Sequence, residues 1–137
     1  SVVTLFLSPF LNFIKSENII KNDENWIDFL ETDITNLVEN DQVVFIDITA
    51  DWCATCQFNK INVLQSKTIK EAFNKNNIIL VRADWTKPSK EIDIFLKRYN
   101  RFGIPLNAFF SSKYPEGILL SEILSEKQIL NSIEKIK

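Results

Sequence analysis

The residues best suited to chemistry in this sequence are Cys53 and Cys56, its only cysteines, which lie in the stretch ITADWCATCQFNK. Such a pair can hold a metal, form a structural crosslink, lie inert in a core or act as a redox couple. A structural zinc site needs four ligands, usually Cys or His, and the sequence has no His. A crosslink that closes so short a loop removes little entropy from the unfolded chain. CxxC after a strand and at the start of a helix is typical of a redox couple.

The order of the two thiols predicts their roles. We expect Cys53 in the first turn of a helix, where backbone N–H groups lack partners and the helix dipole is positive. Both effects stabilise a thiolate, which is the nucleophile. Cys56 lies one turn later on the same face, so it can attack a mixed disulfide on Cys53 and release the partner reduced. We therefore expect Cys53 to be exposed and attacking, and Cys56 to be shielded and resolving.

Asp47 is an acidic residue inside an apolar stretch, six residues before Cys53. One interpretation is a carboxylate at an edge position or in an ion pair. The other is a desolvated acid beneath the CxxC helix, with its pKa raised by burial. Such an acid can take the proton from Cys56 as that thiol attacks.

Pro105 stands at the start of a predicted strand, where it cannot donate to a β-ladder. A cis Ile104–Pro105 bond would resolve this conflict. It would present the backbone of Ile104 to an incoming peptide and pack against the two sulfurs. Cis bonds are a small minority of X–Pro bonds, so this prediction depends on the pairing with CxxC.

The elements that must position these residues alternate between strands and helices. The stretch 42–50 is β-branched and almost wholly apolar, which predicts a central strand buried on both faces. Spacing and turn residues predict an α/β fold with a mixed central sheet, parallel pairs, a C-terminal antiparallel hairpin and flanking helices. We expect helices over 22–40, 53–65, 68–75, 89–100 and 125–136, strands over 42–50, 77–84, 105–110 and 117–124, a turn over 113–117, and helix caps at Asn22 or Asp23, Ser89 and Ser125.

Length and charge limit the remaining possibilities. A chain of 137 residues fits one domain, and a net charge of -2 without a clustered basic excess argues against nucleic-acid binding. The sequence has no Met, so we expect a processed product or an excised fragment. Residues 1–22 are expected as an apolar segment or linker, and 23–137 as the domain. The apolar start is too short to span a bilayer, which takes roughly 20 residues. It either packs on the domain or is the end of a membrane helix.

The stretches FIDITADWCATC, VRADWT and GIPL, in this order, resemble the thioredoxin superfamily. More narrowly, they resemble the C-terminal periplasmic domain of the DsbD and ScsB-like family of thiol:disulfide interchange proteins. The resemblance runs from Val43 to Ile133 and implies a thioredoxin fold. It implies that Cys53 attacks and Cys56 resolves. It also implies that Asp47 is the buried acid, Pro105 the cis-proline and Trp52 the aromatic residue beside the site.

The resemblance also implies a setting and a set of partners. Such a domain belongs to a membrane protein at the periplasmic face of the bacterial inner membrane. It takes electrons from a membrane-embedded donor domain of the same protein and passes them to periplasmic thiol-disulfide proteins. We expect a monomeric domain with no cofactor and no metal. Cytochrome c biogenesis, disulfide isomerisation and a stress pathway stay open as destinations of the electrons.

The residues around the thiols predict a docking surface and a direction of transfer. We expect Trp52 to be exposed beside the thiols, and Ala54, Thr55, Ile104 and Pro105 to contact substrate with it. The Ala54-Thr55 dipeptide offers no cation to stabilise the thiolate strongly. Strong oxidants depend on a very stable reduced form, so we predict a reductant or electron relay. Trp85, by contrast, is expected to give core or helix-supporting packing.

Two positions depart from the family's pattern. Lys60 stands where relatives often carry Glu; it either favours the thiolate, pairs with Asp47 or faces solvent. Asn107 stands where relatives often have an aromatic residue. Two other functions remain as alternatives: a soluble cytoplasmic thioredoxin-like reductase and a non-catalytic thioredoxin-fold binding module. The apolar start argues against the first alternative, and the intact CxxC argues against the second.

Overall fold

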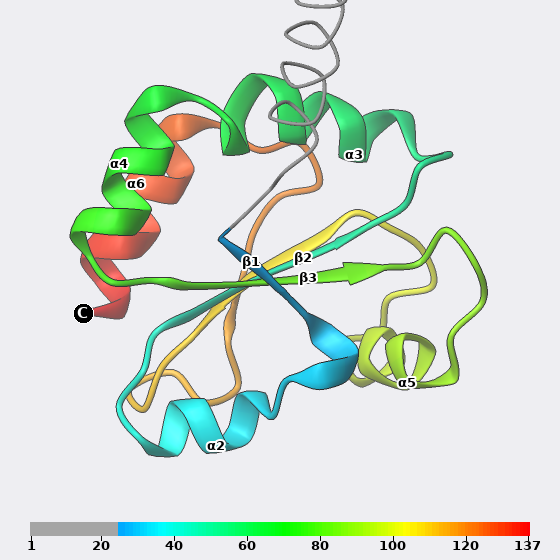
Figure 1. Cartoon of the computed structure of the whole chain (residues 1–137), viewed down its shortest axis with the longest axis horizontal. Coiled ribbons are helices and arrows are strands. Elements are labelled where there is room, and N and C mark those ends of the chain that lie inside the picture. Colours follow the sequence, from blue (N-terminus) through cyan, green and yellow to red (C-terminus); the bar gives the residue numbers. More distant parts are fainter. Residues whose placement is uncertain (1–24) are drawn as a thin grey trace, which may run out of the picture.

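The computed structural model of the chain describes residues 25–137, and its centre is one mixed sheet with strand order β1-β3-β2-β4-β5 (Figure 1). Pairing is parallel between β1, β3 and β2, and antiparallel between β2, β4 and β5. The mixed sheet and its C-terminal antiparallel hairpin confirm the sequence-based prediction. The strands are β1 (Trp26–Asp28), β2 (Val44–Thr49), β3 (Ile79–Asp84), β4 (Leu106–Phe110) and β5 (Ile118–Leu119).

Helices cover both faces of this sheet (Figure 1). On one face lie α2 (Ile34–Glu39) and α5 (Lys90–Arg98). The other face carries four helical segments, namely α3 (Ala54–Asn59), the π-helix η2 (Lys60–Leu64), α4 (Lys67–Lys75) and α6 (Glu126–Ile136). Among the described residues, no helix is long and apolar enough to cross a membrane.

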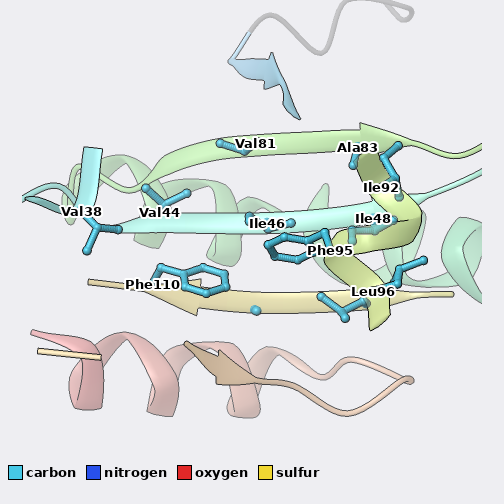
Figure 2. Close-up of a cluster of buried hydrophobic side chains, with 12 residues drawn as sticks. Val38, Val44, Ile46, Ile48, Val81, Ala83, Ile92, Phe95, Leu96 and Phe110 are labelled. Atoms are coloured by element: carbon cyan, nitrogen blue, oxygen red, sulfur yellow. The ribbon is translucent and has the colours of Figure 1, made fainter. Parts of the chain in front are cut away.

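The central strand β2 supplies apolar side chains to both faces, because successive residues of a strand point to opposite sides. All six of its residues are buried, as predicted. Val44, Ile46 and Ile48 belong to the core under α5, which Figure 2 shows. Phe45 belongs to the second core, which η2, α4 and α6 complete. Asp47 therefore points to the same face as Phe45, the face that carries the CxxC helix.

Serine side chains begin three of the helices. Ser89 and Ser125 accept the amide N–H of the third residue after each of them, which confirms both predicted caps. Ser66 starts α4 in the same way. The capping box predicted at Ser125 is not completed, because the side chain of Gln128 donates to the hydroxyl of Ser121 at 2.9 Å.

The helix predicted over 22–40 is wrong across most of its described part. Residues 26–28 form the edge strand β1, and a single 3-10 turn, η1 (Phe29–Glu31), separates it from the short α2. The side chain of Asp28 accepts the amide N–H of Leu30, and that of Asp33 accepts the amide N–H of Asn36. Each hydrogen bond caps the start of a separate short helix, η1 and α2. Pairing with β3 thus outweighs the helical spacing. The caps expected at Asn22 or Asp23 and the boundary between residues 22 and 23 lie outside the described residues.

The strand predicted over 117–124 is also shorter than expected, with only Ile118–Leu119 assigned. It follows the predicted turn, where Gly117 has a φ of 87° and a Cβ would lie 2.6 Å from the Phe110 ring. Beyond the strand, the amide N–H of Leu124 donates to the side chain of Asn59 at 2.9 Å. The backbone at Leu124 is therefore bound by a side chain from α3.

Candidate active site

Cys53 and Cys56 form a disulfide at the start of α3, with their Cα atoms 5.2 Å apart. Cys53 is the N-cap residue of the helix, and the amide N–H of Cys56 donates to its sulfur at 3.2 Å. Amides in a first helical turn have no partner within the helix. The same amide can stabilise a thiolate on Cys53 once the disulfide is reduced.

Both cysteines are buried in this oxidised state. Cys53 is 7% exposed and Cys56 is 3% exposed, and Ala50 and Ile104 pack against them. The expectation of an exposed Cys53 is therefore wrong for the disulfide form, in which Cys53 packs with Ala50, Cys56 and Ile104. The shielding predicted for Cys56 is confirmed.

The Ile104–Pro105 peptide bond is cis, as predicted. Pro105 is buried directly before β4, and Ile104 is half-buried. The carbonyl oxygen of Ile104 lies 4.0 Å from the sulfur of Cys53. This loop therefore brings a backbone segment beside the sulfur that is expected to attack.

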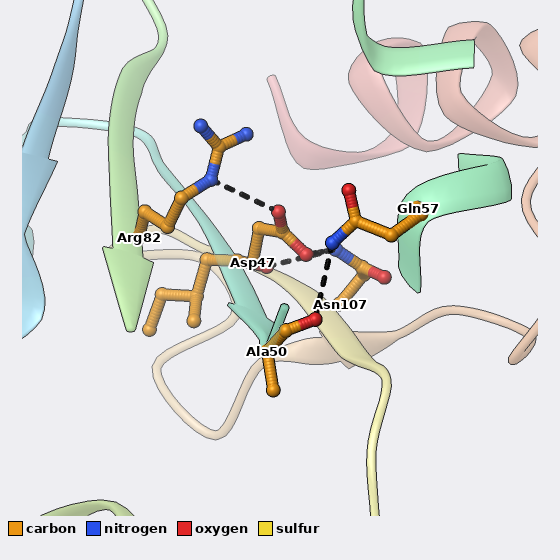
Figure 3. A network of polar contacts seen from close by, with 6 residues as sticks. Asp47, Ala50, Gln57, Arg82 and Asn107 are labelled. Carbon is orange, nitrogen blue, oxygen red and sulfur yellow. Dashed lines mark hydrogen bonds and ion pairs between the residues drawn. The ribbon is translucent and has the colours of Figure 1, made fainter. Parts of the chain in front are cut away.

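Asp47 is buried and paired on both carboxylate oxygens (Figure 3). Arg82 Nε donates to its Oδ2 at 3.2 Å, and Asn107 Nδ2 donates to its Oδ1 at 2.8 Å. Burial raises the pKa of the Asp47 carboxyl, while the charges of Arg82 and Lys60 and the hydrogen bond from Asn107 oppose this. Asp47 is therefore both desolvated and ion-paired, while its proton transfer with Cys56 stays a prediction.

Lys60 follows α3 directly and is half-buried. Its positive charge is the weakest of the influences that oppose the raised pKa of Asp47. The three interpretations of Lys60 stay predictions. Lys60 also opens the π-helix, in which the amide of Gln65 donates to the Lys60 carbonyl at 2.9 Å.

The motifs TADWC and ADWT are joined by hydrogen bonds through Thr86. The Asp51 amide donates to the Thr86 hydroxyl at 3.0 Å, and the Trp52 indole Nε1 donates to the Thr86 carbonyl at 3.2 Å. The rings of Trp52 and Trp85 lie 6.3 Å apart. Trp52 is 63% exposed, as expected, while Trp85 is half-buried against the core. The loops that carry the two motifs therefore contact each other.

The remaining predicted site residues lie in the first turn of α3. Ala54 is exposed and Thr55 is half-buried. Both come from the helix start that carries the disulfide, so small side chains border the sulfurs on this side. Phe102 lies in the loop before the cis-proline and is 85% exposed, an apolar side chain that the sequence analysis did not single out.

Four further residues support the site, and sequence reasoning missed their roles. Arg82 could have been found from the sequence, since a basic residue within an apolar strand indicates a buried acidic partner. Asn107 was noted only as a departure, and Thr86 only as part of a motif. Asn59 is buried and bridges the next loop, because it donates to the Glu122 carbonyl at 2.7 Å and accepts from the Leu124 amide. Polar residues of this kind have no pattern that reveals their partners.

Metal-ligating side chains do not gather near this site. Within residues 25–137, no group of three or more Cys, Asp or Glu side chains is placed to hold a metal ion. The groups gathered at the site are two sulfurs and the backbone beside a cis-proline, with the buried carboxylate of Asp47 on the sheet face that carries α3.

Known proteins share this sequence pattern. A family model described as thioredoxin-like matches residues 25–112. The thiol:disulfide interchange protein DsbD of Haemophilus influenzae strain PittGG is 29% identical over 120 residues, which are 85% of this chain and 19% of that protein. DsbD of Yersinia pestis is 34% identical over 71 residues, or 51% of this chain and 11% of that protein. The chain thus spans about a fifth or less of the length of these curated relatives.

Solved structures share the fold. The C-terminal domain of Neisseria meningitidis DsbD in the oxidised form has a TM-score of 0.61 and 24% identity, and covers 75% of this chain and 88% of that domain. A thioredoxin from Thermus thermophilus also has a TM-score of 0.61, with 16% identity over 82% of this chain and 85% of its own. The predicted fold and the predicted resemblance are both confirmed.

Proposed function

Since this chain belongs to the thioredoxin-like family, we propose that it is a thiol–disulfide oxidoreductase that reduces disulfides of partner proteins through Cys53 and Cys56. The observation that carries the proposal is the disulfide at the N-terminus of α3, with the Ile104 carbonyl oxygen 4.0 Å from the Cys53 sulfur. This disulfide is one of the two states that the reaction cycle requires, and the dithiol is the other.

The first step is an attack by Cys53. In the reduced chain its thiolate attacks one sulfur of the partner's disulfide, and a bond forms between the two sulfurs. The partner's S–S bond breaks, and its second sulfur leaves as a thiolate that takes a proton from water. The Cys56 amide, which donates to the Cys53 sulfur in the disulfide, favours the attacking thiolate.

The second step is resolution by Cys56. Its thiol gives a proton to the Asp47 carboxylate, its sulfur bonds to that of Cys53, and the partner's remaining sulfur leaves as a thiolate. Asp47 then returns the proton to solvent or to this leaving group. Two electrons have moved from the cysteine pair to the partner. A desolvated carboxylate on the face that carries α3 is suited to this role.

We assign the docking of partner proteins to the residues that surround the disulfide. Trp52 stands out from the surface, and its indole is held by Thr86, so it offers a rigid apolar contact. The backbone before the cis bond lies beside the Cys53 sulfur and can meet an extended partner segment. We assign the contact with substrate to Trp52, Ala54, Thr55 and Ile104, together with the backbone at the buried Pro105.

The direction of transfer that we propose is reductive. Similarity to DsbD supports a relay in which a membrane-embedded domain of the same protein reduces this domain. The domain then reduces periplasmic thiol-disulfide proteins at the outer face of the inner membrane. The CATC motif supports this direction, because neither residue between the cysteines is a cation that would stabilise a thiolate strongly.

Insulin reduction by the whole 137-residue chain, with dithiothreitol as the electron source, tests the reaction. We expect Cys53→Ser to abolish the reduction. Cys56→Ser should keep the first step and accumulate a mixed disulfide that a non-reducing gel resolves. Ser112→Ala, at an exposed position away from the disulfide, is the control and should react as wild type does. Equal reduction by Cys53→Ser and wild type would refute the proposal.

The electron donor separates the relay from its alternatives. We expect rapid reduction by the membrane-embedded domain of the full-length protein and slow reduction by NADPH with a cytoplasmic thioredoxin reductase. The reverse order would favour a soluble thioredoxin-like reductase. Partner binding that is equal in wild type and Cys53→Ser, without turnover in either, would favour a binding module.

A further inference from the structure

Asn107 is a buried polar residue that the proposed reaction has not yet used. It lies on β4, directly opposite Asp47 of β2 in the antiparallel register, and is 2% exposed. Its Nδ2 donates to Asp47 Oδ1 at 2.8 Å and to the Ile46 carbonyl at 3.5 Å. Its Oδ1 is buried without a hydrogen-bond partner among the described residues. Both of its donors are thus used, and its acceptor is not.

This arrangement is unfavourable for stability alone. A buried acceptor without a donor destabilises a fold, and an apolar residue of similar size would avoid that penalty. The other residues of β4 are all apolar and buried, namely Leu106, Ala108, Phe109 and Phe110. The packing of this strand therefore gives no reason for an amide side chain at position 107. The amide faces one group that is proposed to take part in the chemistry, the carboxylate of Asp47.

We propose that Asn107 is a positioning residue for the resolving step, which holds Asp47 as an ionised and correctly oriented acceptor for the Cys56 proton. An amide N–H can donate to a carboxylate in either state but binds the ionised form more strongly. Arg82 holds the other oxygen, so the carboxylate is fixed from both neighbouring strands (Figure 3). The inference rests on the proposed function, because it assigns the geometry of one of its two steps.

The charges around Asp47 set the size of the expected effect. Arg82 faces it from β3 and Lys60 from η2, and both favour the ionised carboxylate. The segment α3 contributes Cys56 but no charged side chain. Loss of the Asn107 donor therefore leaves two cations in place. It should raise the pKa of Asp47 and release one oxygen, without abolishing the reaction.

Ellman's reagent separates the two steps in a single experiment. The reduced whole chain forms a mixed disulfide on Cys53 and releases one thionitrobenzoate. Cys56 then displaces the second in an intramolecular step. At reagent concentrations that make the first release the faster one, the later release reports the resolving step. We expect Asn107→Leu to move the pH midpoint of the second release upward by about one pH unit. At pH values below this midpoint, the second release should then be about tenfold slower than in the wild type. The first release should change less than about twofold.

The background Asp47→Asn separates positioning from a general structural effect. If Asn107 acts through Asp47, then adding Asn107→Leu to Asp47→Asn should leave the pH profile of the second release unchanged. Asn107→Val, which suits a strand and has no side-chain donor, is the second variant should Asn107→Leu fail to fold, with the same expected direction. Near-ultraviolet circular dichroism checks that each variant is folded.

Two results would overturn the inference. One is a second release with the same pH profile in wild type and both Asn107 variants. The other is an equal shift in the Asp47→Asn background. Failure of the proposed function is distinct, because the wild type would then show no second release or would react equally after Cys53→Ser.

Discussion

The Nε atom of Arg82 lies 3.2 Å from Oδ2 of Asp47, so a buried carboxylate on β2 is paired with a guanidinium on β3. The two residues are direct partners in the parallel register of these strands. The guanidinium also lies over the ring of Trp26, 4.0 Å from its centre. One side chain therefore joins the edge strand, its neighbour and the acid that we assign to proton transfer.

We predict that Arg82→Met destabilises the chain in a pH-dependent way. Removing one partner of a buried ion pair costs about 3–5 kcal/mol, because the other charge stays buried. At low pH the loss is smaller, since Asp47 can take a proton and become neutral. Urea unfolding should therefore show a larger loss at about pH 9 than at about pH 5. Arg98→Met, at an exposed position, is the control, and equal losses at both pH values would contradict the prediction.

The raised pKa of Asp47 makes the contribution of this carboxyl to the stability of the wild type fall as pH rises. The folded chain binds this proton more tightly than the unfolded chain does. This contribution is therefore highest below the unfolded pKa and declines until the folded pKa is passed. Asp47→Asn cannot ionise, so its urea unfolding free energy should decline less over this window. Parallel curves for the two proteins would show that Asp47 does not titrate in this way.

Thr86 should hold the loop that carries Trp52. Thr86→Val removes the hydroxyl that accepts from the Asp51 amide, and we expect a loss of about 1 kcal/mol in the free energy of unfolding. Thr86→Ser keeps the hydroxyl and is the matched control. Trp52 fluorescence should also change in Thr86→Val, because its ring is fixed through the same residue. A variant with wild-type stability and emission would show that the contact is not significant.

Asn59 should contribute strongly to stability for a polar residue. Asn59→Leu leaves the Glu122 carbonyl and the Leu124 amide without their partner, and we expect a loss of about 2–4 kcal/mol. Asn62→Leu is the matched control three residues later. Its side chain is exposed and bonds only within its own helix, so we expect a change below about 0.5 kcal/mol. Similar losses in both variants would refute the bridging role.

The sequence allowed a sound prediction of the central strand and the disulfide site because their signals are local. The β-branched, almost wholly apolar stretch 42–50 predicts a buried strand, and the CxxC that begins three residues later lies at the start of a helix. The cis Ile104–Pro105 bond was also predictable, once the proline was considered with the thiols. These features depend on neighbouring residues in the chain, and the structure confirms them.

The features that were missed depend on residues distant in sequence. The partners of Asp47 are 35 and 60 residues away, and only the register of three strands brings them together. The helix predicted over 22–40 failed for a related reason. Trp26, Ile27 and Phe29 fit a helical spacing, yet pairing of residues 26–28 with β3 requires a strand. Burial also differed, since a closed disulfide hides Cys53, which the pattern of residue types does not reveal.

Both margins of the sheet consist of short strands, Trp26–Asp28 and Ile118–Leu119. Within residues 25–137, few unpaired backbone groups are therefore available for an added strand from another molecule, which disfavours capture by sheet extension. We expect partner proteins to be retained chiefly by the transient disulfide to the Cys53 sulfur and by a small contact surface around it. The residence time of a partner would then follow the lifetime of this mixed disulfide, so that fast disulfide exchange is accompanied by fast dissociation.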